Sequence, residues 1–533
     1  MKRIRILICC VMMMAMCVSL GACTSQDSGG TGEAKTTLTT ARSKDIGDLN
    51  GHLYAGDMAA QGMVFDTLVE NTADGPKAAL AESWDISKDG TVYTFHLRKG
   101  VNFTDGQPFN AEAVKANIDA VQRNPEKHAW ISLSKKIKSV DIVDDNTVNI
   151  VLSEPYYPIL TELGLLRPYC MMSPATFING ETKDGVSAFV GTGPYKLTEH
   201  VQNQYATFVS NDEYWGGEPK IKTVTFKVLP AGQTAQLALQ NGEIDFLYSN
   251  YSDAMLDSET LKSMGTNKDY QIVYSEPCAT RFLMVNASKP ETIIADKNIK
   301  EAIWYGINKE ELSSEILSGL ETPAETLFPS TAPYCDVKLK ERTFDTAKAK
   351  KLIEASGWKM ESGSEYYTKN GEKLSVRIEY RTDVAGVKGI CEYLQSNLKD
   401  IGIELVLTGE EKSAYYDRRK TGDYDLLIDA TWGVPYDPQS TMSAFSAPSS
   451  YLTSTQNLEN SQEMFDWIDQ ALVSTDEVKR QELYTKVLNK IQDDACFIPL
   501  TDVQVIAVAP KDLKNITFNQ SQYEIPFEKM YFE

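Results

Sequence analysis

The chain of 533 residues lacks the motifs by which many hydrolases and metal enzymes are recognised. It contains neither G-x-S-x-G nor H-E-x-x-H, and it offers no convincing pairing of cysteine with histidine. It has no cluster of Lys and Arg, and its net charge of −21 argues against a nucleic-acid partner. Beyond the N-terminal segment, no apolar run is long enough to span a membrane. We therefore predict neither an enzyme nor a nucleic-acid-binding protein.

Cysteine and histidine are scarce in the body of the chain. All four histidines precede residue 201. The cysteines beyond the N-terminal segment are odd in number, widely spaced and without a C-x-x-C pair, which argues against a disulfide framework or a zinc site. We expect these residues to be buried, inert thiols. They are Cys170, Cys278, Cys335, Cys391 and Cys496.

Residues 1–22 have the features of a secretory signal. A positively charged start precedes an apolar run, residues 6–20, that is too short for a permanent transmembrane helix. Leu20-Gly21-Ala22-Cys23 resembles a bacterial lipobox, so Cys23 is predicted to carry lipid; a core cysteine near an ordinary cleavage site is the alternative. Residues 23–36 are polar and predict a flexible tether. The body then lies at the outer face of the cytoplasmic membrane, held by acyl chains.

The rest of the chain has the composition and patterning of a large α/β protein. Hydrophobic residues make up 42% and aromatic residues 10%, so more than one core can form. The patterns predict strands at 147–152, 205–209, 222–228, 271–274, 375–380, 404–407 and 505–508. They predict helices at 231–240, 296–306, 345–357 and 387–400. Strands 375–380 and 404–407, with the helix between them, form a β-α-β unit typical of an open sheet.

Residues 81–118 are the most informative stretch. Apolar and polar residues alternate from Tyr93 to Leu97, and Asp89-Gly90 suits a tight turn, which predicts a β-hairpin. Asn110 is placed to cap a following helix. This stretch resembles the signature of the extracytoplasmic solute-binding proteins of peptide and nickel ABC importers. The residues that match are AESW, then DG, then YTFHLRKGVNFTDGQPFNAEAV.

This resemblance implies a two-lobed, periplasmic-binding-protein-like (type II) fold, with a subdomain inserted in the first lobe and a hinge that closes around a ligand. We assign residues 37–75, 190–276 and 502–533 to lobe I, 76–189 to the inserted subdomain and 277–501 to lobe II. The two hinge crossings are expected near 274–281 and 497–503. The family also implies partnership with the permease and ATPase subunits of an importer, a monomeric state and no permanent cofactor.

Four patches favour the nickel-binding branch of the family. The segment around Tyr54 and Met58 resembles its pocket, KHAW at residues 127–130 resembles its R-H-A-W, and LRPY resembles its segment around a ligand-gripping arginine. Residues 431–438, TWGVPYDP, nearly match the T-W-G-A-P-Y-D-P of the nickel branch. Tyr416 aligns with a further pocket tyrosine of that branch. The resemblance implies a ligand site that consists of Tyr54, Met58, Lys127, Trp130, Arg167, Tyr416, Trp432 and Tyr436.

A physical argument supports this set. Two indoles and two phenols can stack on a flat, anionic metal chelate and exclude water, and an arginine offers planar donors to a carboxylate. Methionine adds a soft, adaptable wall. Other roles stay open: an aromatic residue can belong to the core, and Arg167 can form a surface ion pair. His52 is better explained as a core imidazole than as a metal ligand.

Two departures from the nickel branch bear on the ligand. Lys127 stands where the branch has arginine, which keeps the charge and loses bidentate geometry. The branch supplies a histidine to the metal after P-Y-D-P, whereas residues 440–456 contain none and Ser450 stands in its place. A hydroxyl is a poor substitute for nitrogen on nickel. We therefore predict a complete chelate as ligand, in which histidine or an opine-type metallophore satisfies nickel or a similar metal.

The alternative is a di- or oligopeptide-binding component of a peptide importer. Such a protein grips the terminal amine of its ligand with a carboxylate, and Asp437 is the acid that could do so. The same residue, placed before Pro438, is better explained as shaping its loop.

Overall fold

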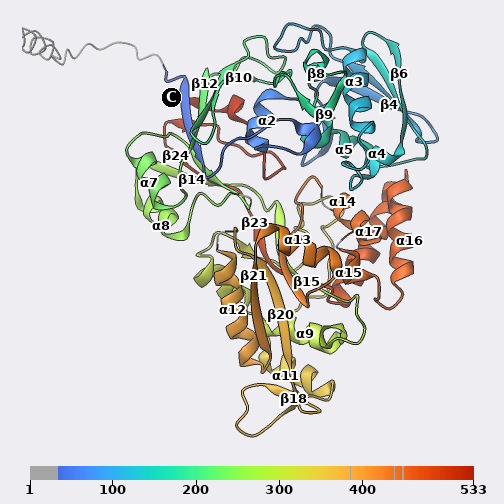
Figure 1. Cartoon of the computed structure of the whole chain (residues 1–533), viewed down its shortest axis with the longest axis vertical. Coiled ribbons are helices and arrows are strands. Elements are labelled where there is room, and N and C mark those ends of the chain that lie inside the picture. The colour runs from blue at the N-terminus through green and yellow to red at the C-terminus, as the bar shows by residue number, and fades with distance from the viewer. Residues whose placement is uncertain (1–33, 252, 385, 437, 447–448, 450) are drawn as a thin grey trace, which may run out of the picture. The chain divides into compact units, whose positions relative to one another are not determined.

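The computed structural model describes residues 34–533 except 252, 385, 437, 447, 448 and 450 (Figure 1). The signal segment 1–22, Cys23 and most of the tether therefore lie outside the described residues, as do Asp437 and Ser450. Within the unit formed by residues 36–533, helices and strands alternate along the chain, which confirms the mixed α/β fold. Along the described chain, with its short gaps, no helix has both the length and the apolar character needed to cross a bilayer.

The predicted hairpin lies in a four-stranded antiparallel sheet with the order β4-β5-β7-β6. Its strands are β4 (Ala81–Ile86), β5 (Val92–Leu97), β6 (Ile137–Asp144) and β7 (Thr147–Leu152). Every second residue of β5 is buried, so Tyr93, Phe95 and Leu97 enter the core. Helix α3 (Ala111–Gln122) packs on β6, and Asn110 caps it by accepting a hydrogen bond from Ala113 N at 3.0 Å. The hairpin, turn and helix expected for residues 81–118 are confirmed.

Two further sheets join the N-terminal half of the chain to its tail. One has the order β1-β12-β11-β10, with β1 and β12 parallel, and the other has the order β13-β24-β14. Their strands are β1 (Thr37–Arg42), β10 (Tyr195–Val201), β11 (Tyr205–Ser210), β12 (Thr223–Val228), β13 (Leu247–Ser249), β14 (Tyr270–Tyr274) and β24 (Ile506–Pro510). Because β24 pairs with both β13 and β14, the C-terminal tail returns to the part of the fold where the chain began.

A six-stranded sheet with the order β16-β23-β15-β22-β20-β21 organises the second half. Its strands are β15 (Ala279–Val285), β16 (Thr322–Pro323), β20 (Ser375–Arg381), β21 (Glu404–Glu410), β22 (Leu426–Ala430) and β23 (Phe497–Val503). Strands β20 and β21 are parallel and are joined by α12 (Val387–Asp400), which lies beside them in Figure 1. This arrangement confirms the predicted β-α-β unit. Helix α11 (Thr346–Ala355), capped by Asp345, packs on α9 (Lys297–Gly306).

The chain passes between these sheets twice. Strand β14 pairs with β24 and strand β15 pairs with β23, so residues 275–278 and 504–505 are the connecting segments. The crossing expected near 274–281 contains the first of them. The segment expected near 497–503 forms β23, whose apolar run reflects burial within the sheet, and the connecting residues 504–505 follow directly after it. The division into two lobes and an inserted subdomain remains our proposal.

The remaining elements are short or lie on the outside of these sheets. The strands are β2 (Val69–Thr72), β3 (Gly75–Ala78), β8 (Phe177–Ile178), β9 (Glu181–Val186), β17 (Lys359–Met360), β18 (Tyr367–Lys369), β19 (Glu372–Lys373), β25 (Leu513–Lys514) and β26 (Tyr531–Phe532). The helices include η1 (Gly51–Leu53), α2 (Met58–Val64), α4 (Ser132–Lys136), α6 (Leu166–Tyr169), α7 (Gln233–Gln240), α8 (Ser258–Thr266), α13 (Lys412–Thr421), α14 (Gln439–Ser446), α16 (Ser461–Val473) and α17 (Glu477–Asp493). The five cysteines of the described chain are all buried.

Candidate ligand-binding site

Four aromatic rings from distant segments meet in what we call the ring cluster: Tyr54, Trp130, Trp432 and Tyr436. Tyr54 ends η1, Trp130 precedes α4, and the other two lie in the loop between β22 and α14. The centroid of the Trp130 ring lies 5.5 Å from that of Tyr54, 5.4 Å from that of Trp432 and 6.2 Å from that of Tyr436. The first two contacts are edge-to-face, a favourable geometry for aromatic pairs. All four side chains are half-buried, so each ring keeps some surface for a further partner.

The Tyr54 hydroxyl donates a hydrogen bond to His128 Nδ1 at 2.8 Å. Burial, and in smaller part the charge of Lys127, lowers the pKa of His128 to about 4, so the imidazole is a neutral acceptor at physiological pH. Burial also raises the pKa of Tyr54. Lys127 is exposed, and its Nζ lies 6.0 Å from the centroid of the Tyr54 ring. Residues 127–130 therefore supply a ring, an acceptor and a cation around one tyrosine.

The Arg167 guanidinium faces the protein in this arrangement. Its Nε donates to Gln61 Oε1 at 2.6 Å, and its Nη2 donates to the carbonyl oxygens of Ala55 at 3.0 Å and Gly56 at 2.6 Å. A longer bond of 3.4 Å joins Nη1 to the Tyr54 carbonyl oxygen. Most of its donors are thus occupied, and they hold the turn that carries Tyr54. Gln61 completes this network, although no role was assigned to it from the sequence. Its position as a polar residue inside an otherwise apolar helix could have indicated a buried hydrogen bond.

The other predicted residues lie around the ring cluster. Met58 begins α2, is half-buried and packs against the core under this helix. Tyr416 is 42% exposed on α13 and contacts Tyr415 and Arg381, so the structure does not bring it into the cluster. His52 is buried and satisfied at both nitrogens, by Thr182 Oγ1 at 3.0 Å and the Cys170 carbonyl oxygen at 3.1 Å. These contacts agree with its interpretation as a core imidazole.

A cavity of about 500 Å³ adjoins the ring cluster, and we call it the mixed-charge cavity. Gly56 and Asp57, which follow the Tyr54 turn, form part of its wall, and Tyr416 and Tyr523 form another part. This cavity could not be predicted from the sequence, because its charged residues come from widely separated segments of the chain. They are Arg42, Lys44, Asp45, Asp57, Asp253, Arg381, Asp383 and Lys412.

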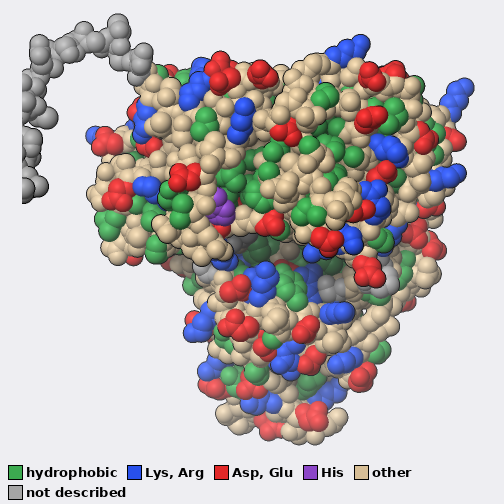
Figure 2. All heavy atoms as spheres, turned by 45° about the horizontal axis from the view of Figure 1, so that its top comes forward, with side chains coloured by type: hydrophobic (Ala, Val, Ile, Leu, Met, Phe, Trp, Pro, Cys, Tyr) green, Lys and Arg blue, Asp and Glu red, His purple; other side chains and the backbone are tan. Residues whose placement is uncertain are grey.

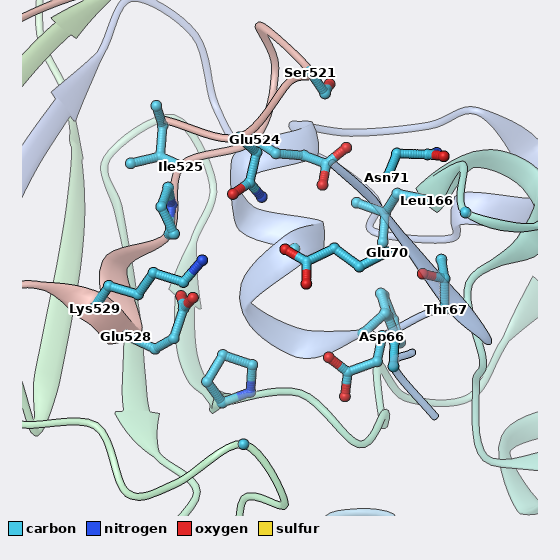
Figure 3. Close-up of a pocket in the computed structure, with 18 of the residues that line it drawn as sticks. Asp66, Thr67, Glu70, Asn71, Leu166, Ser521, Glu524, Ile525, Glu528 and Lys529 are labelled. Carbon is cyan, nitrogen blue, oxygen red and sulfur yellow. The ribbon is translucent and has the colours of Figure 1, made fainter. Parts of the chain in front are cut away.

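A second cavity, of about 460 Å³, lies behind Leu166 and Pro435, which are the neighbours of Arg167 and Tyr436. It is rich in carboxylates, and Figure 3 shows Glu70, Glu528 and Lys529 pointing toward its middle. Burial raises the pKa of Glu524 and of Glu528 to about 7. This cavity belongs to the wall behind the ring cluster and shares no lining residue with the mixed-charge cavity.

Among the described residues, no group of three or more His, Cys, Asp and Glu side chains is arranged to hold a metal ion. The site offers rings, hydroxyls and cations instead. The rings can stack on a planar ligand, and the cations can bind its negatively charged groups. These side chains are poor donors to a transition metal and would not displace the ligands that a chelator provides.

Comparison with known proteins places these features in context. The model of the family described as bacterial extracellular solute-binding proteins, family 5 Middle, matches residues 75–452. The chain is 37% identical over 500 residues to the nickel-binding periplasmic protein of Escherichia coli (strain K12), which covers 93% of this chain and 95% of that protein. It is 25% identical over 478 residues to the dipeptide-binding protein of the same strain, with 85% of each chain covered.

Among solved structures, the chain is similar to NikA from Brucella suis in complex with Fe(III)-EDTA. The identity is 37% and the TM-score is 0.90, with 93% of this chain and 100% of the other covered. The similarity therefore extends over the sheets and helices that carry the ring cluster.

Proposed function

Because the chain belongs to the bacterial extracellular solute-binding proteins of family 5, we propose that it captures a chelate of nickel, or of a similar transition metal, at the ring cluster and delivers it to a membrane permease. Proteins of this family are the substrate-binding components of ABC importers and work with permease and ATPase subunits. The family and the type II fold expected from the sequence are confirmed.

The convergence of the ring cluster is the observation that carries this proposal. Tyr54, Trp130 and Trp432 are separated by long stretches of sequence, and yet the centroid of the Trp130 ring lies 5.5 Å from that of Tyr54 and 5.4 Å from that of Trp432. Trp432 comes from the half of the chain built on the six-stranded sheet and Tyr54 from the other half, so a ligand between them links the two. Ligand-driven closure of a hinged protein requires contacts of this kind.

The chelator, rather than the protein, satisfies the metal in this proposal. The nearest imidazole, His128, is already used by the Tyr54 hydroxyl at 2.8 Å. Aromatic rings and an ammonium group such as that of Lys127 recognise the outside of an anionic complex. Nickel with histidine or with an opine-type metallophore has this character, and free Ni²⁺ does not.

We further propose that the protein is a monomer, anchored to the outer face of the cytoplasmic membrane through lipid on Cys23. The lipobox resemblance of residues 20–23 supports the anchor. Mass spectrometry of the mature protein tests it: an acylated N-terminal cysteine is expected, and an unmodified N-terminus after residue 22 contradicts the proposal.

A di- or oligopeptide ligand is the second candidate, favoured by the 25% identity to a dipeptide-binding protein. A peptide ligand requires a carboxylate partner for the terminal amine and leaves the metal without a role.

Calorimetric titration of metal-free protein separates these candidates. The titrants are Ni²⁺ alone, Ni²⁺ with two equivalents of L-histidine, and a dipeptide. We expect heat from the nickel–histidine complex and an affinity for Ni²⁺ alone that is weaker by about two orders of magnitude, roughly 3 kcal/mol. Equal affinity for Ni²⁺ with and without histidine refutes the chelate, and heat only from the dipeptide selects the second candidate.

A further inference from the structure

The mixed-charge cavity lies between the two halves of the chain. Arg42, Lys44 and Asp57 line it from the part built on β1 and α2, whereas Arg381 and Lys412 line it from the part built on the six-stranded sheet. Figure 2 shows a hollow between the upper and lower parts of the view, with basic side chains along its lower edge. Gly56 and Asp57 line the cavity and follow Tyr54 of the ring cluster in the chain, and Tyr523, which also lines the cavity, is close enough to Tyr436 of the ring cluster to act on it electrostatically.

The acids in the wall of this cavity already have partners. Arg42 Nε lies 3.1 Å from Asp253 and 3.4 Å from Asp57. Arg381 donates two hydrogen bonds to Asp383, at 2.9 Å and 2.6 Å. The fourth acid, Asp45, contacts His200 Nε2 at 2.9 Å and accepts a bond from Asn203 N at 2.6 Å.

Two lysines in the same wall have no such partner. Lys44 and Lys412 form no ion pair or hydrogen bond with any residue that the structure describes, and both are exposed. The pKa of Asp383 is lowered, chiefly by the hydrogen bonds from Arg381 and in smaller part by Lys44, which acts on it across the cavity. Lys412 is the first residue of α13, where the helix dipole adds positive potential and makes a lysine unfavourable for the helix itself.

A buried cation adds to this potential. Arg42 is 4% exposed and lines the cavity, and its Nη1 has no hydrogen-bond partner within the described part of the chain. An unsatisfied buried donor is costly unless a ligand or water completes it. The buried Arg42 guanidinium therefore contributes positive potential, and the exposed cationic donors of the wall are those of Lys44 and Lys412, one from each half of the chain.

We infer that the mixed-charge cavity is a second compartment of the ligand site, which binds a carboxylate-bearing arm of the chelate between Lys44 and Lys412. This inference rests on the proposed function, because it assumes that the ring cluster holds the metal-bearing end. It assigns the charge recognition of the ligand to lysines across the cleft, in place of the guanidinium of Arg167, whose donors are mostly occupied. It also selects an extended, polycarboxylate chelator over a compact bis-amino-acid complex.

Two nickel complexes test the second compartment. One is nickel with two equivalents of L-histidine, which is compact, and the other is nickel with a histidine whose amine carries a carboxypropyl arm. Calorimetry on the full soluble chain compares the wild type with Lys44→Ala, Lys412→Ala and the double variant. Lys420→Ala is the matched control, because Lys420 is an exposed lysine of the same helix α13 outside the cavity wall.

We expect the wild type to prefer the carboxypropyl complex. Each lysine variant should lose roughly ten-fold or more in affinity for this complex, the usual effect of one charge-assisted contact, and should bind the bis-histidine complex as the wild type does. The Lys420→Ala variant should bind both complexes unchanged. Unaltered affinity of the double variant for the carboxypropyl complex overturns the second compartment and leaves the proposed function standing. If the wild type binds neither complex, the proposed function fails and the inference fails with it.

Discussion

The hydrogen bonds of Arg167 predict that Arg167→Ala destabilises the protein, whereas the sequence alone predicts a ligand contact at this residue. Two of these bonds are short, to Gln61 and to the Gly56 carbonyl oxygen at 2.6 Å each, and a third, to the Ala55 carbonyl oxygen, has the ordinary length of 3.0 Å. A hydrogen bond from a charged donor contributes about 1.5–3 kcal/mol, and such terms are not additive. Because Gly56 is exposed and water can replace part of what is lost, we expect a loss of about 2–4 kcal/mol in the free energy of unfolding.

The assay is equilibrium unfolding in urea, followed by tryptophan fluorescence, with Arg167→Lys and Arg123→Ala measured beside Arg167→Ala. Lysine keeps the charge and can satisfy fewer carbonyls, so it should restore part of the lost stability. Arg123 is an exposed residue that pairs with the half-buried Glu181 at 2.5 Å and donates to the Gly180 carbonyl oxygen at 2.9 Å, and its removal should cost at most about 1 kcal/mol.

Titration with the nickel–histidine complex completes the experiment. If Arg167 positions the Tyr54 turn, the alanine variant should lose stability and chelate affinity together. Wild-type stability of Arg167→Ala combined with complete loss of chelate binding refutes this reasoning, since it means that the guanidinium acts on the ligand directly.

Three further predictions follow from other contacts. Trp130→Ala removes the central ring and should weaken chelate binding at least ten-fold, about 1.4 kcal/mol, in calorimetry. Trp84→Ala is the control and should leave the affinity unchanged, because it removes a half-buried ring that packs on Phe95, its partner on the neighbouring strand of the sheet β4-β5-β7-β6. Tyr157→Phe removes the acceptor of the 2.7 Å hydrogen bond from the Tyr334 hydroxyl, which joins the first half of the chain to the second, so small-angle scattering should report a larger radius of gyration without ligand. Glu524→Gln should stabilise the protein above neutral pH. Burial raises the folded-state pKa of Glu524 to about 7 from 4.5, so wild-type stability falls as pH rises through this window, and the advantage of the variant should grow by up to ~3 kcal/mol between about pH 5 and pH 8 in urea unfolding.

Local patterns predicted the elements whose determinants are local. The alternation along β5, the capping residues Asn110 and Asp345 and the periodicity of α12 are written in contiguous residues, and each gave the observed element within a residue or two. The crossing near 497–503 could not be separated from a buried strand, because both are apolar runs without alternation.

The partners of the site residues could not be predicted in the same way. The sequence named the members of the ring cluster through their motifs, but the surroundings of Arg167 depend on backbone carbonyls, which carry no sequence signature. Arg381 and Lys412 lie in a strand and a helix that give no hint of a cavity, and only their placement opposite Arg42 and Lys44 makes them a group. Charge recognition that is assembled across a cleft is a tertiary property.

The ring cluster also constrains how a ligand enters. Trp130 and Trp432 are 5.4 Å apart in an edge-to-face contact, whereas a planar ligand stacked between two rings needs about 3.5 Å on each side, roughly 7 Å in total. The rings must therefore part before a chelate binds between them, and the two halves of the chain must part with them, because Trp432 and Trp130 belong to different halves. Parting the rings costs about 0.5–1.5 kcal/mol for each ring contact that is lost, and this cost opposes binding. The hydrogen bond between Tyr157 and Tyr334 also holds the two halves together and opposes binding in the same way. Tyr157→Phe should for this reason favour ligand entry, and it leaves every ring–ligand contact in place. We therefore expect the rate of association to rise and the rate of dissociation to change less.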